Sequence, residues 1–402
     1  MTVEELPVVG EEFMQHTHST LEQLRGEGRV CPIVMPRGTP SYLVTGYEDA
    51  RALLNDPRMS KDSAGAYHLM AAKIGPENTI SDSGQSLVSH MLNADPPDHT
   101  RLRKLVNKAF TARTVARLRP RIEEITAGLL DAMEGHDRAD LLPSFAGPVP
   151  ITVICELLGI REEDRGEFTG WSNTLLSSGE AEEMQAAGQS MHAYLVGLVG
   201  QKRAEPGQDL LSDLVLTTDE GDSLSEEELV ATAFLLLVAG HETTVNLIAN
   251  ATLALLRAPE QLAKLRADPS LLPGAVEEFL RFDGPINIAT LRFTTEPIEV
   301  GGTTIPEGEF VQVSLLAANR DAERFPDPDE LDITRPAGGH VAFGHGIHYC
   351  VGAPLARLEA EIALGGLLAR FPDLRLAVEP EQLRYRNSTL VHGLQELPVL
   401  LR

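Results

Sequence analysis

One cysteine in a glycine-rich loop constrains this 402-residue chain more than any other feature. The loop runs from Phe343 to Gly352 with the sequence FGHGIHYCVG, and a helical pattern follows from Ala353 to Arg370. Glycines adopt backbone angles closed to other residues and let a flat partner approach closely. The amides at the start of the helix point toward the Cys350 sulfur, and their dipole favours the thiolate over the thiol. A thiolate in this position is a metal ligand or a nucleophile.

The residues around the cysteine leave more than one interpretation open. The simplest is a glycine-rich turn that buries a small apolar side chain. A second is a zinc site, with the candidate ligands His340, His345, His348 and Cys350. Zinc normally requires a second close pair of Cys or His residues at helical or knuckle spacing, and no such pair is obvious here.

A third interpretation rests on the spacing within the loop. The positions of Phe343, Gly346, His348, Cys350 and Gly352 resemble the haem-binding signature of the cytochrome P-450 family. This resemblance implies haem b as the cofactor and Cys350 as the thiolate ligand of its iron. It also implies that Phe343 and Gly344 contact the haem and that His348 lies near a haem propionate. The likeness is closest to soluble bacterial members, particularly actinobacterial enzymes that oxidise macrolides.

The segment 225–257 is the longest periodic stretch, and it is predicted to form a buried central helix. Ser225 and Glu228 make a capping-box pattern at its start. The interior is apolar on all sides up to Ala239, and then the polar stretch 240–244 follows. Polar groups inside a buried helix cost free energy unless they are satisfied, so this stretch suggests function. A zinc-protease motif is rejected, because Val245 stands where a second histidine is needed.

The same stretch resembles the oxygen-binding groove of the P-450 family. The resemblance implies that Ala239 and Gly240 lie against the haem, that Thr243 holds bound oxygen and water, and that Glu242 helps to deliver protons. A threonine hydroxyl that bonds back to a carbonyl can bend a helix, which makes room for dioxygen. The alternative is that the polar residues of this stretch are a local defect of the helix without a function.

Other positions match the family in chain order. His99 and Arg103 are four residues apart, so they share one face of a helix, where a surface pair is the ordinary interpretation. The resemblance implies that both bind a haem propionate and that Arg292 binds a second one. It also implies a structural ion network, which consists of Glu278, Arg281 and Arg335.

Composition limits the partners and the compartment. The net charge of −25 argues against general binding to nucleic acid or to an anionic membrane. The three cysteines lie far apart, which argues against a disulfide framework. The N-terminus lacks an apolar signal segment, and the longest apolar run is shorter than the roughly 20 residues that span a bilayer. We therefore expect a soluble, cytoplasmic protein, and we expect a monomer.

One stretch departs from the acidic balance. Between residues 98 and 121 there are eight basic residues and one acid, including Arg101, Lys104, Lys108 and Arg113. A solvated helix face is one interpretation, and a patch for an acidic partner is the other. The chain has no dinucleotide or flavin fingerprint and no iron–sulfur cysteine cluster. Electrons should therefore come from separate chains, a ferredoxin docking at this patch and its ferredoxin reductase.

The resemblance extends along nearly the whole chain, and it sets the remaining expectations. The fold should be mainly α with small β-sheets, the triangular-prism P-450 fold with a long central helix over the haem, in one domain spanning 1–402. Residues 56–97 are expected to be irregular, and a helix junction at Gly179 is a candidate lid. Substrate contacts are expected from Leu87, Val88, Val238, Ala239, Ile288 and Val391.

The function expected from the resemblance is a haem-dependent monooxygenase. It should insert one oxygen atom of O2 into a C–H bond of a bulky, mainly apolar natural product such as a macrolide or polyketide. Hydroxylation is the default outcome, and epoxidation is possible. Two other classes stay open: a haem protein that binds a ligand without oxidising it, and a zinc-dependent hydrolase. The intact Glu242-Thr243 pair argues against the first, since pure binding needs no proton delivery.

Overall fold

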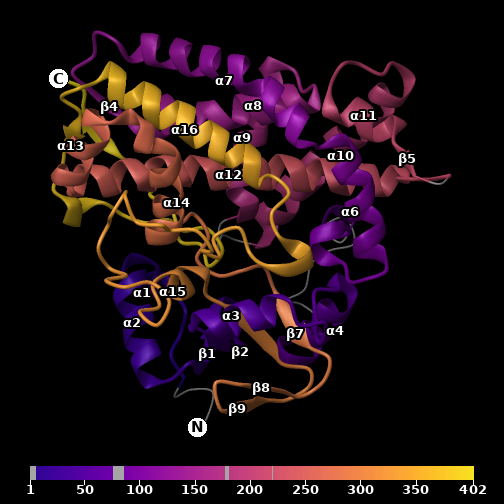
Figure 1. Cartoon of the computed structure of the whole chain (residues 1–402). Coiled ribbons are helices and arrows are strands. Elements are labelled where there is room, and N and C mark those ends of the chain that lie inside the picture. The colour runs from indigo at the N-terminus through magenta and orange to yellow at the C-terminus, as the bar shows by residue number, and fades with distance from the viewer. Residues whose placement is uncertain (1–5, 76–85, 177–180, 220) are drawn as a thin grey trace. The chain divides into compact units, whose positions relative to one another are not determined.

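The computed structural model describes residues 6–75, 86–176, 181–219 and 221–402 (Figure 1). The chain forms two compact units, each assembled from segments that are separated in sequence. The first unit comprises Met1–Met59, Arg121–Val149 and Thr243–Arg402, and the second comprises Ser60–Pro120 and Pro150–Glu242. The chain is mainly helical, with a few short sheets.

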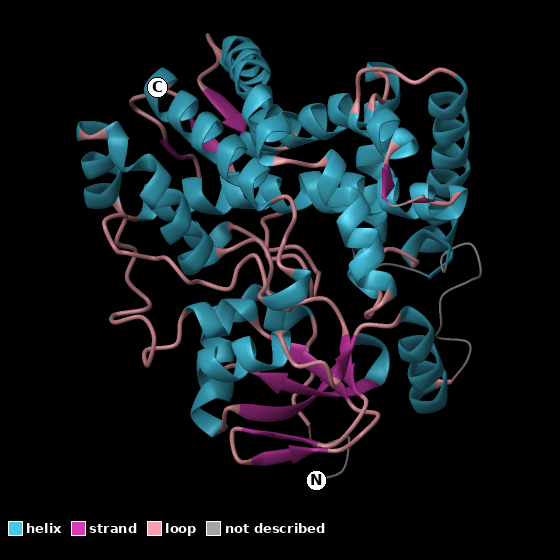
Figure 2. Ribbon diagram, turned by 45° about the vertical axis from the view of Figure 1, so that its right-hand side comes forward, coloured by secondary structure: helices cyan, strands magenta, loops and turns pink. Residues whose placement is uncertain are grey.

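The largest sheet lies in the first unit, and its strands are magenta in Figure 2. Its order is β1-β2-β10-β7-β3. The strands are β1 (Val30–Met35), β2 (Thr39–Val44), β10 (Phe310–Val313), β7 (Arg292–Thr294) and β3 (Met59–Ser60). β2 pairs antiparallel with β1 and parallel with β10, which pairs antiparallel with β7. Helices α3 (Tyr47–Leu54) and α15 (Leu315–Asn319) supply apolar side chains to the core on this sheet.

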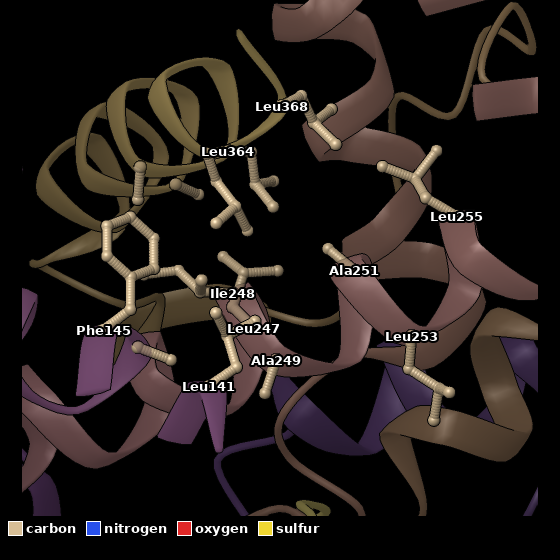
Figure 3. Packing of buried hydrophobic residues seen from close by; sticks show 14 of the residues in the cluster. Leu141, Phe145, Leu247, Ile248, Ala249, Ala251, Leu253, Leu255, Leu364 and Leu368 are labelled. Atoms are coloured by element: carbon tan, nitrogen blue, oxygen red, sulfur yellow. The ribbon is translucent and has the colours of Figure 1, made fainter. Parts of the chain in front are cut away.

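The helical part of the first unit packs around a second core. Its helices are α13 (Pro259–Ala267), α14 (Leu272–Asp283), α16 (Ala353–Arg370) and the C-terminal part of α7 (Ala112–Met133). Figure 3 shows Phe145, Ile248 and Leu364 converging in this core from three segments, and all three are fully buried. Burial of this many apolar side chains is the main force that holds such a helix array together.

Smaller elements complete the first unit. At its N-terminal end lie α1 (Glu11–Gln15) and α2 (Thr17–Glu27). A three-stranded sheet has the order β11-β12-β4, with β11 (Arg375–Leu376), β12 (Pro398–Leu400) and β4 (Arg138–Asp140). β8 (Ile298–Val300) and β9 (Thr303–Ile305) form a separate hairpin.

The second unit is almost entirely helical. It contains α4 (Ser63–Ile74), α6 (Asp98–Ala109), α8 (Pro148–Leu158), α9 (Arg165–Leu176), α10 (Ala181–Ala204) and α11 (Leu210–Leu216). The Phe168 ring of α9 meets the Tyr194 ring of α10 edge to face, and Trp171 of α9 packs edge to face on Phe168. A short hairpin of β5 (Thr218–Asp219) and β6 (Asp222–Ser223) closes the unit.

The central helix α12 (Glu226–Arg257) runs without interruption from the second unit into the first. The expected capping box is confirmed, because the Glu228 amide donates to the Ser225 hydroxyl and the Ser225 amide donates to the Glu228 carboxylate. This helix is long and apolar enough to cross a membrane, but 72% of its most apolar window is buried inside the protein. That burial is typical of the core helix of a globular protein.

Residues 56–97 are not irregular throughout, because α4 forms within them. The Asp62 carboxylate caps this helix by accepting a hydrogen bond from the Gly65 amide. The apolar residues of α4 are spread around the helix, so the sequence shows no apolar periodicity there, and none of its side chains is buried. The expected lid junction at Gly179 lies outside the described residues.

Candidate functional site

Main-chain hydrogen bonds shape the cysteine loop. The Cys350 amide donates to the Phe343 carbonyl at 2.9 Å, and the Gly344 amide donates to the Val341 carbonyl at 2.8 Å. The thiol of Cys350 is exposed, whereas Cys31 and Cys155 are buried. Gly352 caps the N-terminus of α16, and a Cβ atom placed on it would lie 3.8 Å from the Cys350 sulfur. The loop therefore presents one accessible sulfur beside the amide end of an 18-residue helix.

The glycine requirement of the loop is clearest at Gly346. Its φ of +75° lies in the left-handed region, where other residues are strained. A Cβ atom there would also stand 2.6 Å from the Asn55 Oδ1 atom and 3.0 Å from the Leu54 carbonyl oxygen. The loop is thus pressed against the end of α3, and the sequence needs glycine for both conformation and space.

A charged clamp holds the outer side of the loop. Arg357 of α16 forms a bidentate pair with Glu277 of α14, at 2.6 and 2.9 Å. The Arg357 guanidinium lies 4.5 Å from the ring centre of Phe343, in cation–π geometry. Burial raises the pKa of Glu277, but hydrogen bonds from His340 and Arg357 outweigh this effect and lower it to about 2. Glu277 is therefore a permanent anion that fixes Arg357 against the loop.

The proposed zinc ligand His340 is already engaged at both ring nitrogens. Its Nε2 atom lies 3.2 Å from a Glu277 carboxylate oxygen, and its Nδ1 atom accepts the Ala342 amide at 3.2 Å. A metal at His340 would have to displace these bonds. This geometry argues against the zinc interpretation of the cysteine loop.

The expected ion network is buried deep in the first unit. Arg281 donates to both carboxylate oxygens of Glu278, at 2.7 and 2.8 Å, and both side chains are fully buried. Arg335 lies 3.3 Å from the same carboxylate. Arg281 also donates to the main-chain carbonyls of Asn319 and Pro328, so the network ties α14 to the segment that precedes the cysteine loop.

The polar stretch of α12 interrupts an otherwise buried helix. Ala239 is exposed, and Gly240 and Thr243 are half-buried, whereas Glu242 is buried. Ala239 and Thr243, which lie one turn apart, therefore remain partly accessible on this helix. A Cβ atom on Gly240 would stand 2.9 Å from the Ile154 side chain, so this glycine is needed for the close approach of α8. Packing thus explains Gly240, which the sequence analysis assigned only to cofactor contact.

Two polar side chains of this stretch have defined surroundings. The Nδ1 atom of buried His241 lies 2.8 Å from the Leu237 carbonyl, one turn earlier. Burial raises the pKa of the Glu359 carboxyl on α16 to about 8, against the opposing effect of the nearby Thr244 hydroxyl. Glu359 is thus protonated at neutral pH, and it lies near Thr244, the residue that follows Thr243. Glu359 was not expected from the sequence, although an acid between the apolar residues Leu358 and Ala360 was a signal.

A family model described as Cytochrome P450 matches residues 172–382. Cytochrome P450 107B1 of Saccharopolyspora erythraea is 52% identical over 402 residues, which cover 99% of each chain. This chain belongs to the cytochrome P450 family. Mycinamicin IV hydroxylase/epoxidase of Micromonospora griseorubida is 42% identical to this P450, covering 95% of it and 94% of the relative. The tirandamycin C-bound P450 monooxygenase TamI has a TM-score of 0.92 and 49% identity, covering 98% of this P450 and 100% of TamI.

Family membership establishes the cofactor and the class of reaction. This P450 is a monooxygenase that uses haem with a cysteine thiolate on the iron, and it takes electrons from redox partners. The residues present fit that cofactor, because one accessible cysteine stands at a helix start and Ala239 and Thr243 of the central helix remain partly accessible. A non-catalytic haem protein and a zinc hydrolase are not favoured.

The other expected haem residues of this P450 are divided between the units. His99 and half-buried Arg103 lie on α6 of the second unit. Arg292 begins β7 in the first unit, where it is buried and donates to the Thr290 carbonyl. Buried Arg292 contradicts what its flanking sequence indicates, since strand alternation alone predicts an exposed side chain there. His348 is half-buried in the turn Gly346–His348 of the cysteine loop.

The expected substrate residues of this P450 also come from both units. Ile288 and Val391 lie in the first unit, where both are buried and Val391 bridges to Ile286. Leu87 and Val88 precede α6 in the second unit, and Val238 lies on α12. Ala239 follows Val238 on α12 and is exposed.

The basic patch of this P450 is largely neutralised by its own chain. Lys104 and Lys108 both pair with Asp219 of the β5–β6 hairpin, the first at 2.5 Å. Arg101 pairs with Asp222 and Glu228. Arg113 is exposed on α7. Three of the four basic residues assigned to a partner are therefore engaged within the second unit, which weakens their expected role.

Proposed function

We propose that this P450 hydroxylates or epoxidises a bulky, mainly apolar natural product of the macrolide or polyketide type. One observation carries the proposal: TamI, the match with a TM-score of 0.92, holds tirandamycin C. The name of a second relative describes hydroxylation and epoxidation of mycinamicin IV, which fits the same substrate class. The expected pocket residues are apolar, as such a ligand requires. These residues are Leu87, Val88, Val238, Ala239, Ile288 and Val391.

Cys350 would be the iron ligand, because it is the exposed cysteine of the three and stands at a helix N-terminus. Haem with a thiolate ligand supplies the activation of dioxygen. His99, Arg103, Arg292 and His348 would bind its propionates, since cationic and hydrogen-bonding side chains suit carboxylates. Phe343 and Gly344 of the loop, with Ala239 and Gly240 of α12, would lie against its faces.

Glu242, Thr243 and Glu359 would manage protons. The Thr243 hydroxyl is half-buried and can hold a water molecule by hydrogen bonds. The raised pKa of Glu359, about 8, means that its carboxyl carries a proton at neutral pH. A proton store near Thr244 and a carboxylate at Glu242 would together supply the protons that oxygen reduction consumes.

Electrons would come from a ferredoxin, which a ferredoxin reductase reduces. Arg113 is the best candidate for contact with an acidic ferredoxin among Arg101, Lys104, Lys108 and Arg113, because the other three have acidic partners within the chain. The whole chain would act as one monomeric, cytoplasmic haem domain. Two observations support the single domain: the relatives align over nearly its full length, and α12 runs unbroken through both units.

A spin-state screen followed by turnover tests the proposal. The holoenzyme is titrated with a macrolactone, a tirandamycin-type polyketide, vitamin D3 and a fatty acid, and the Soret band reports displacement of water from iron. Ligands that bind are then incubated with a surrogate ferredoxin, its reductase and 18O2. We expect a polyketide-type ligand to bind and to gain one labelled oxygen atom. Oxidation of the fatty acid or vitamin D3 alone would overturn the substrate class.

A matched variant separates binding from chemistry in that screen. Thr243→Ala should keep the spin-state shift, because the substrate contacts remain, while labelled product falls. A parent enzyme that binds ligands but oxidises none of them under these conditions would overturn the proposed reaction on this substrate class.

A further inference from the structure

Three potential metal ligands meet in the first unit, away from the cysteine loop. The Nε2 atom of His18, on α2, lies 2.6 Å from Oδ1 of Asp283, the last residue of α14. The Nε2 atom of His392 lies 3.0 Å from the same oxygen. The ligand atoms of the three side chains all lie within 4.8 Å of one another. Segments separated by up to 374 positions therefore converge on one point with two imidazoles and one carboxylate.

We propose that His18, Asp283 and His392 form a binding site for a divalent transition-metal ion, for which Zn²⁺ is the best chemical match. Two neutral imidazole nitrogens and one carboxylate oxygen make a common three-residue zinc set, and water takes the fourth position. The His18 side chain is 28% exposed, whereas His392 is buried. The metal and its water therefore have access from the His18 side.

The charges at the cluster suit a dication. The cluster brings the Asp283 carboxylate between the two imidazoles, with its Oδ1 atom 2.6 Å from His18 Nε2 and 3.0 Å from His392 Nε2. Arg320 opposes a metal, but it is held by the Phe282 carbonyl and by Asp329.

The metal-free contacts are hydrogen bonds, in which each imidazole donates an Nε2 proton to Asp283. For the metal to bind at Nε2, each neutral ring takes the tautomer whose proton is on Nδ1, which frees the Nε2 lone pair and releases no proton. Zinc bonds of about 2.0–2.2 Å require the three ligand atoms to move apart by some tenths of an ångström. The partly exposed His18 on the short helix α2 can supply most of that movement.

The surroundings support the two buried ligands. Asn250 of α12 donates to the main-chain carbonyls of both Asp283 and His392, at 3.2 and 3.0 Å. The Tyr385 ring stacks on the His392 ring with centres 4.7 Å apart and planes 17° apart. Such outer contacts orient ligands and strengthen metal binding. A bound metal would join α2, the end of α14 and the turn that contains Val391.

The test measures zinc on the untagged holoenzyme. The protein is dialysed against micromolar Zn²⁺, and zinc and iron are counted together by mass spectrometry. The parent should hold one zinc per haem iron, and a crystal should show anomalous scattering at the zinc edge beside Asp283. His18→Gln should lower zinc affinity at least about tenfold, as loss of a zinc-supporting group does. His16→Gln, at an exposed histidine two residues away, should retain zinc.

Asp283 is buried in the core, so the partly exposed His18 carries the main comparison, with haem content as the check of folding. Zinc should also raise the Tm of the parent and of His16→Gln, but not of His18→Gln, because only binding to the folded protein stabilises it. No zinc above the His18→Gln level, or equal zinc in all variants, would overturn the site and leave the cluster a hydrogen-bonded triad.

Discussion

Replacement of Glu359 by glutamine should stabilise this P450 at neutral pH. Burial raises the pKa of the Glu359 carboxyl from its ordinary 4.5 to about 8, so the folded protein keeps a proton that the unfolded chain has lost at pH 7. Each pKa unit corresponds to about 1.4 kcal/mol. Between pH 4.5 and pH 7 this shift therefore lowers the free energy of unfolding of the parent by about 3 kcal/mol. Glutamine is neutral in both states, so Glu359→Gln removes this cost.

The sign of the pH dependence is specific. The pKa of Glu359 is raised in the folded protein, so this carboxyl costs the parent no stability below pH 4.5. The cost grows as the pH rises from 4.5 toward 8. Guanidinium unfolding, followed by circular dichroism at several pH values, should show the gap between Glu359→Gln and parent widening by about 3 kcal/mol from pH 5 to pH 8. Glu361→Gln is the control, because it removes a carboxyl from the same helix. Parallel pH profiles for parent and Glu359→Gln would refute the reasoning.

Four further outcomes follow from the site. Cys350→Ser should abolish the red-shifted Soret band of the reduced carbon monoxide complex, and an unchanged band would remove Cys350 as the ligand. Thr243→Ala should divert most NADPH consumption into peroxide, which a peroxide assay alongside product measurement detects; equal coupling in parent and variant would count against it. Arg113→Glu should slow ferredoxin-driven turnover about tenfold at low salt while peroxide-driven turnover survives; the same slowing by Lys104→Glu alone would point to the paired residues instead. Arg357→Met should lower the free energy of unfolding by about 2 kcal/mol, measured by denaturant titration, because Glu277 loses a bidentate partner.

The sequence predicted the features that depend on neighbouring residues. The helix after the cysteine begins at Ala353 and ends at Arg370 in the structure, as its pattern indicates. The capping box of α12 was visible because its two residues are three positions apart. The glycine at position 346 was visible as part of a spacing, but its contact with the end of α3 was not, because Asn55 lies almost 300 residues away.

Features that depend on distant segments could not be predicted in this way. The charge of Lys108 is balanced by Asp219, 111 residues later, so a count of basic residues overstated the free charge of the patch. Burial decides the protonation of Glu359, and a sequence shows the acid but not its burial. The apolar residues of α4 are spread around the helix rather than gathered on one face, so its cap at Asp62 was the local sign of it that the sequence offered.

Main-chain amides and carbonyls shape the cysteine loop. The bonds from Cys350 to Phe343 and from Gly344 to Val341 are both main-chain bonds, and none of them involves the thiol. The backbone of the loop would therefore hold a different side-chain donor atom in the same position. A serine or a selenocysteine in place of Cys350 would inherit the same position, so the electronic character of this catalyst can be altered without redesigning its backbone.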